Sequence, residues 1–194
     1  MKLDASTILT CHPSTPCAAV YQFSVRVWRE GSKLALQYRL EGDINALEIP
    51  PTAPAQRADG LWQTTCCELF IKGSLQTDSV FKTESVLGGG YYEFNFSPST
   101  AWAAYAFSAY RQGMVSTDLA EPVTIAVRQT AAWLELEAVV NMDGLAMIQE
   151  GAKLHLGLSA VIQQKSGDVS YWAFAHPAGK PDFHHPDGFA CELA

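Results

Sequence analysis

The stretch that decides the fold is Val20–Glu41, VYQFSVRVWREGSKLALQYRLE. Apolar and polar residues alternate in both of its halves, and a period of two is typical of half-buried strands. Gly31 and Ser32 separate the halves, and a short turn of this kind favours a β-hairpin. The expected core-facing side chains are Tyr21, Phe23, Val25 and Val27, followed by Leu34, Leu36, Tyr38 and Leu40.

The same alternation recurs along the rest of the chain. It predicts strands over residues 61–72, 91–96, 102–110, 124–129, 133–140, 154–164, 171–174 and 189–193. Residues 1–18 have no such pattern and are expected to be irregular, and one short helix is expected over residues 142–149. Short strands joined by turns favour two antiparallel sheets packed face to face. We therefore predict an all-β, two-sheet β-sandwich of the immunoglobulin-like or jelly-roll type, forming a single domain over residues 1–194.

Composition narrows the classes of function. The chain has 194 residues, of which 48% are hydrophobic, and a net charge of −7. A negative surface disfavours non-specific binding to nucleic acid or to an anionic membrane. No apolar run is long enough for a signal peptide or a membrane span, so we expect a cytoplasmic protein with its five cysteines as free thiols. Exposed strand edges are compatible with a monomer or a homodimer.

Two predicted strands carry acids on the side away from the core. Glu68 lies on one strand, and Glu93 lies on the next with Asn95 beside it. Arg26 and Arg39 lie on the polar side of the first hairpin, so a shared sheet would gather acids, amides and arginines on one face. Such a face suits a polyhydroxylated ligand, because hydroxyls both donate and accept hydrogen bonds. It also suits a pair of glycosidase acids, or simply solvated ion pairs.

Three tryptophans lie near strand ends: Trp62, Trp102 and Trp172. A tryptophan at such a place can stack on a sugar ring because its face is large, flat and electron-rich. Tryptophan inside a sandwich is more often a core residue, so each has two interpretations.

The loop that follows Trp172 is rich in proline and histidine. His184 and His185 are flanked by Asp182 and Asp187, a set of residue types that can bind a divalent ion. Adjacent histidines in an extended loop point apart, however, so we expect no metal there. The remaining interpretations are that a histidine pins the loop by a hydrogen bond or that it contacts a ligand.

Four segments together resemble bacterial DOMON-like proteins, which are related to family 9 carbohydrate-binding modules. They are LWQTTCCELFI at 61–71, YEFNFSP at 92–98, WAAY at 102–105, and the stretch from His176-Pro177 to His184-His185-Pro186-Asp187. The resemblance covers most of the chain from about residue 20. It implies an antiparallel sandwich with a ligand pocket at one sheet, where aromatic rings clamp a sugar and polar side chains bind its hydroxyls.

A second branch of that superfamily binds haem through a methionine with a histidine or lysine, and Met114 is the candidate methionine here. We expect no cofactor, with haem as the alternative, and a non-enzymatic module that binds a small ligand, a saccharide by analogy. A glycoside hydrolase using Glu68 and Glu93 is the other alternative. The predicted ligand-binding residues are Trp62, Glu68, Glu93, Asn95, Trp102, Trp172, His184 and His185.

Overall fold

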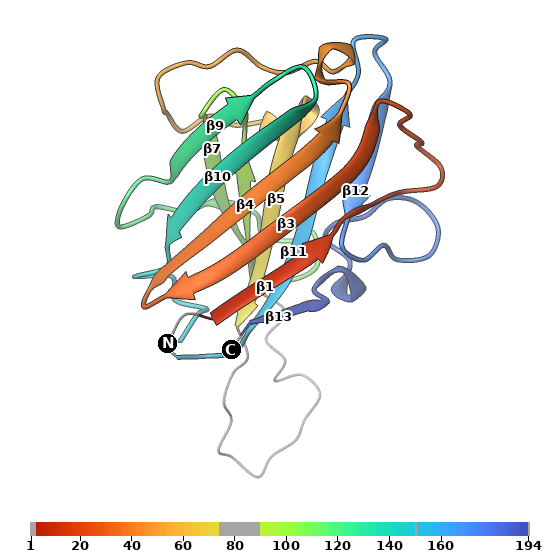
Figure 1. The fold of residues 1–194 in the computed structure, drawn as a ribbon. Coiled ribbons are helices and arrows are strands. Elements are labelled where there is room, and N and C mark those ends of the chain that lie inside the picture. Colours follow the sequence, from red (N-terminus) through yellow and green to blue (C-terminus); the bar gives the residue numbers. More distant parts are fainter. Residues whose placement is uncertain (1–2, 74–89, 150, 194) are drawn as a thin grey trace.

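A computed structural model of the protein describes residues 3–73, 90–149 and 151–193 (Figure 1). The chain forms two layers of antiparallel strands. The first layer is a five-stranded sheet in the order β1-β3-β4-β10-β9. Its strands are β1 (Leu3–Ile8), β3 (Val20–Glu30), β4 (Lys33–Gly42), β10 (Trp133–Asn141) and β9 (Thr124–Gln129).

The second layer is an eight-stranded sheet in the order β2-β12-β11-β5-β6-β7-β8, in which β13 also pairs with β11. Its strands are β2 (Thr10–Cys11), β12 (Val169–Ala173), β11 (Leu154–Gln163), β5 (Cys66–Gly73), β6 (Tyr91–Phe96), β7 (Trp102–Phe107), β8 (Val115–Ser116) and β13 (Cys191–Leu193). Single-turn 3₁₀ segments η1 (Ile44–Ala46), η2 (Leu61–Gln63) and η4 (Pro186–Gly188) lie in the connections.

The predicted all-β sandwich is thus confirmed, and its core lies between the sheets. Alternate side chains of β4 and β6, such as Leu36 and Phe94, are fully buried there. Tyr38 joins the two layers, because its hydroxyl donates a hydrogen bond of 2.7 Å to the backbone oxygen of Glu68 on β5. In the part of the chain that the structure describes, no helix is long and apolar enough to cross a membrane. All five cysteines are free, as expected.

Two expectations about local structure were wrong. Residues 1–18 are not irregular, because β1 pairs along β3 and β2 pairs with β12. Tyr21 does not face the core and is 77% exposed. A shift in the β3–β4 register between Val20 and Gln22 turns Tyr21 outward and leaves Val20 buried.

Other predicted elements also differ from the structure, two of them for a clear local reason. Residues 142–149 form turns instead of a helix. Gly144 takes a left-handed φ of 81°, and the side chain of Asn141 accepts a hydrogen bond of 3.0 Å from the Asp143 amide, so a local turn replaces the helical bonding. The strand expected from residue 61 begins only at Cys66, because left-handed Gly60 leads into the 3₁₀ turn η2.

Candidate functional site

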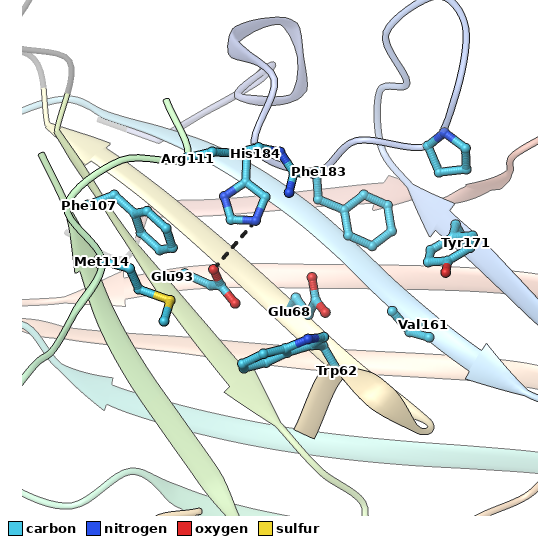
Figure 2. A pocket seen from close by; sticks show the side chains of 11 residues that line it. Trp62, Glu68, Glu93, Phe107, Arg111, Met114, Val161, Tyr171, Phe183 and His184 are labelled. Carbon is cyan, nitrogen blue, oxygen red and sulfur yellow. Dashed lines mark ion pairs between the residues drawn. The ribbon is translucent and has the colours of Figure 1, made fainter. Parts of the chain in front are cut away.

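A cavity of about 490 Å³ lies on the outer face of the eight-stranded sheet (Figure 2). The strands β5 and β6 form its floor, because alternate residues of each strand point away from the core. On β5 these outward residues include Glu68 and Phe70, while Cys67 and Leu69 enter the core. Three connections rise over this floor and turn an outer sheet face into a pocket. They contribute Trp62 from η2, Arg111 and Met114 from the β7–β8 connection, and Pro181, Phe183 and His184 from the loop after β12.

The two acids of the floor are diagonal neighbours. Glu68 lies directly across from Asn95 on β6, and Glu93 lies directly across from Phe70 on β5. Diagonal positions on one face of an antiparallel pair are roughly 7–8 Å apart. Both side chains are directed at the cavity in Figure 2, yet only 3% of Glu68 and 6% of Glu93 is exposed.

Burial changes the acidity of both groups. Desolvation raises the pKa of Glu68 well above its ordinary value, and the neighbouring charge of Glu93 raises it further. Desolvation also raises the pKa of Glu93, although Asn95 opposes this by donating a hydrogen bond of 2.8 Å. Ser159, across from Glu68 on β11, favours ionisation of Glu68, but its buried hydroxyl makes no hydrogen bond of ordinary geometry. The floor therefore holds at least one proton at a pH where a solvated glutamate has lost it.

His184 enters the cavity from the loop after β12, which covers the floor formed by β5 and β6, and its imidazole is neutral. Its ring packs against Phe70 and Phe107, with centroid separations of 5.1 Å in each case. Burial lowers the pKa of His184 to about 4, and Arg111 contributes to the same shift. Its Nε2 lies 3.8 Å from a carboxylate oxygen of Glu93, which is too long for a hydrogen bond and, with a neutral ring, is not an ion pair.

Tyr91 fixes the orientation of this ring. The Tyr91 hydroxyl lies 2.7 Å from Nδ1 of His184, and it accepts a 3.3 Å hydrogen bond from the backbone N–H of Arg111. Burial raises the pKa of Tyr91 to about 12, so the phenol keeps its proton and donates it toward Nδ1. We assign the ring proton of His184 to Nε2 on this basis, which directs an N–H donor into the cavity.

Asp182 ties two of the covering loops together. It accepts hydrogen bonds from the Arg111 guanidinium at 2.8 Å, from the Tyr110 hydroxyl, and from the backbone N–H of His184 at 3.1 Å. Burial opposes ionisation of Asp182, but these donors outweigh it and leave its pKa lowered. Arg111 has a left-handed φ of 53°, a conformation that residues other than glycine rarely adopt. Arg111, at the rim of the cavity, therefore combines a strained backbone conformation with an ion pair to Asp182.

Trp62 forms the wall nearest Glu68 and is 37% exposed. Its ring meets the edge of Tyr105 on β7, with centroids 5.8 Å apart. The Tyr105 hydroxyl donates a 2.6 Å hydrogen bond to Asp59, which also pairs with Arg57 at 3.0 Å. This chain of contacts holds the loop that carries the indole. Further ring walls come from Phe107, Tyr171 and Phe183 (Figure 2).

The structure brings together half of the residues expected from sequence. Trp62, Glu68, Glu93 and His184 line the cavity. Asn95 is fully buried beneath it and contacts Glu93.

The other three residues lie elsewhere. Trp102 and Trp172 face the core between the sheets, and the Trp172 indole donates a 3.0 Å hydrogen bond to the Ser170 hydroxyl. His185 packs edge-on against Tyr110 and does not line the cavity.

The expectation that Arg26 and Arg39 share a sheet face with Glu68 and Glu93 was wrong. Arg26 and Arg39 lie on the five-stranded sheet, whereas Glu68 and Glu93 lie on the eight-stranded sheet. The cation at the cavity is Arg111, which sequence reasoning missed. Its place in a turn after an apolar strand gave no pattern to follow. Tyr171 and Phe183 were within the aromatic and histidine-rich stretch but had not been singled out as cavity residues.

The donor set does not fit a haem. Met114 and His184 both line the cavity, as an axial pair would require. Nδ1 of His184, however, accepts from the Tyr91 hydroxyl at 2.7 Å, and Nε2, which carries the ring proton, faces Glu93 at 3.8 Å, so neither ring nitrogen presents a lone pair to an iron atom. Nor, among the residues described, do three His, Cys, Asp or Glu side chains converge in a way that could hold a metal ion.

Comparison with known proteins gives a likeness in fold. No family model matches the chain, and no curated protein matches it. The structure is similar to the crystal structure of a "putative carbohydrate-binding protein" from Bacteroides uniformis, with a TM-score of 0.60 and 13% sequence identity. The match covers 96% of this chain and 84% of that chain. At this identity the likeness establishes that the two proteins share a β-sandwich architecture.

Proposed function

We propose that the protein binds a saccharide in the cavity on the outer face of its eight-stranded sheet. The observation that carries the proposal is the combination of ring walls and a buried polar floor. In Figure 2, Trp62 lies on one side of Glu68 and Glu93, Phe183 lies on the other side, and His184 offers an N–H beside Phe183. Sugar rings present flat C–H faces that stack on aromatic rings and hydroxyl edges that need donors and acceptors.

Size and fold support this proposal. A volume of about 490 Å³ lies within the ~300–1,000 Å³ range usual for small-ligand pockets, and it suits a mono- or disaccharide. The similar solved structure, although only 13% identical, carries the description of a carbohydrate-binding protein. The DOMON-like resemblance of the sequence implies the same class of ligand.

Titration calorimetry against a panel of mono- and disaccharides tests the proposal. We expect one class of sugar to bind, and Trp62→Ala to weaken that binding by up to about tenfold through loss of ring stacking. Trp133→Ala is the matched control, because Trp133 lies on the other sheet at the start of β10. Absence of binding across the panel at millimolar concentration would overturn the proposal.

Hydrolysis of a glycoside is a second candidate, because Glu68 and Glu93 both face the same cavity. An acid with a raised pKa beside a second carboxyl group is the arrangement that acid–base chemistry on a glycosidic bond needs. Incubation with chromogenic glycosides should then give turnover that Glu68→Gln abolishes while binding remains. Binding without turnover in the wild type would leave the binding module as the function.

A further inference from the structure

The cavity has an unbalanced charge. Besides the phenol Tyr171, four ionisable residues line it: Glu68, Glu93, Arg111 and His184. The positive charge of Arg111 is already matched by Asp182, at 2.8 Å. His184 is neutral above a pH of about 4. The charge of Arg111 also favours ionisation of Glu93, but it is shared with Asp182. Among the described residues that line the cavity, Arg111 is therefore one cation set against Glu68, Glu93 and its own partner Asp182, which leaves the floor with a net negative charge when both acids ionise.

Burial makes this imbalance costly. Two carboxylates that are both more than nine-tenths buried and lie on adjacent strands repel each other in a medium of low dielectric constant. Such a pair is stabilised either by keeping a proton or by receiving a cation. In the free protein, one of the two carboxyl groups keeps a proton. A positively charged ligand can take the place of that proton.

The surroundings match an ammonium group more closely than a metal ion. Aromatic rings lie around the acids in the cavity, including Trp62, Phe107 and Phe183 (Figure 2). A cation over such rings is attracted by their negative faces. An ammonium group has three N–H donors, and the two carboxyl groups of the floor supply oxygen acceptors for them.

We propose that the ligand of this cavity is an amine-bearing saccharide whose ammonium group is held by Glu68 and Glu93. The inference rests on the proposed saccharide function and narrows it to amino sugars. The rings then stack on the sugar, and His184 donates from Nε2 to a hydroxyl or ring oxygen.

The proposal predicts that protons are released to the buffer when the ligand binds. When the ammonium group enters, the floor carboxyl group that holds a proton ionises, and that proton passes to the buffer. A neutral sugar leaves the carboxyl group protonated and releases none. Proton release on binding should therefore accompany amino sugars and not their neutral parents.

The experiment is titration calorimetry with glucosamine, glucose and N-acetylglucosamine. Each titration is run in buffers of different ionisation enthalpy, at a pH below the pKa of the glucosamine amine, so that the amine is protonated. We expect glucosamine to bind at least about tenfold more tightly than either neutral sugar, with proton release. Glu68→Gln and Glu93→Gln should each remove most of this preference and the proton release. Glu48→Gln, which changes an exposed glutamate outside the cavity, should leave both unchanged.

The outcomes separate this inference from the function it rests on. If glucose or N-acetylglucosamine binds as well as glucosamine, the amine inference fails and saccharide binding stands. If none of these sugars and no member of the wider panel binds, both fail. Saturable binding of Ca²⁺ that competes with glucosamine would also overturn the inference, by assigning the acids to a metal. Thermal unfolding of each variant confirms that a loss of binding is not a loss of fold.

Discussion

The outer faces of both sheets carry glutamates. On the five-stranded sheet they are paired with arginines, and on the eight-stranded sheet they are buried without an arginine directly across from them. On the five-stranded sheet, Glu135 lies directly between Arg39 on β4 and Arg128 on β9 in the strand register. Both arginines reach it, at 3.3 Å and 2.6 Å, and the Arg128 side chain remains 64% exposed. Acid and base are matched across the strands of a face that water reaches.

On the eight-stranded sheet the corresponding acids have no such partners. Glu68 lies between Ser159 and Asn95, and Glu93 lies between Phe70 and Tyr105. Loops close over them, so that burial raises the pKa of both carboxyl groups. The difference shows that a sheet face forms a pocket when connections cover it, and that burial then acts on acids that have no arginine directly across the strands. A face whose charges are paired and solvated contributes solubility and modest stability.

The largest expected difference between the faces is in packing. Phe70, 1% exposed, supports Tyr91, His184 and Phe189 on the covered face. Phe70→Ala should lower the free energy of unfolding by about 3–5 kcal/mol, because it leaves a cavity. Trp133→Ala on the open face removes a ring that is stacked on Arg39 and should cost only about 1 kcal/mol. Denaturant unfolding measures both, and equal losses would contradict the comparison.

The acid limb of stability should depend on His184. Its pKa falls from 6.5 to about 4 on folding, so between these values the unfolded chain binds more protons and stability rises with pH. At about 1.4 kcal/mol per pKa unit, the difference between 6.5 and about 4 corresponds to a rise on the order of 3 kcal/mol. His184→Asn should flatten it, as followed by urea unfolding at a series of pH values. His185→Asn, outside the cavity, is the control and should keep the wild-type slope.

Glu68 should act with the opposite sign. Its pKa is raised in the folded state, so above the ordinary value of 4.5 the native protein holds a proton that the unfolded chain has lost, and stability falls as pH rises. Glu68→Gln removes the charge. At pH values above the raised pKa of Glu68, it should therefore stabilise the protein by about 1–3 kcal/mol, the usual cost of an unsatisfied buried polar group. Thermal melts over a pH series measure this. A loss of stability at high pH would show that the carboxylate is satisfied in the folded protein.

The smallest effect is expected on the open face. Arg128→Gln breaks contacts to Glu135 and Glu137, but the arginine is largely exposed. The change should cost less than about 1 kcal/mol, and raised salt should reduce the difference from the wild type. A larger or salt-independent loss would mean that the open face is less solvated than its exposure indicates.

Alternation alone predicted which side of a strand the acids would take. In β5 and β6, polar residues interrupt an apolar period of two, so Glu68 and Glu93 were assigned correctly to the side away from the core. The same rule could not orient Trp102 or Trp172. Their segments, WAAYAF and YWAF, are apolar on both sides, and either ring could have faced the cavity. Pairing with Phe96, a core residue, places Trp102 in the core.

The sequence by itself determined that this chain forms paired β-layers with acids on the outer side of two neighbouring strands, because side-chain direction follows from local periodicity. Tertiary structure decided which hairpin joins which sheet, and so separated Arg39 from Glu68 and brought Arg111, Tyr171 and Phe183 to the acids. Arg111 and Phe183 come from connections and Tyr171 from β12, all far along the chain from Glu68. Their meeting depends on how the loops pack over the sheet, and no short-range pattern encodes that packing.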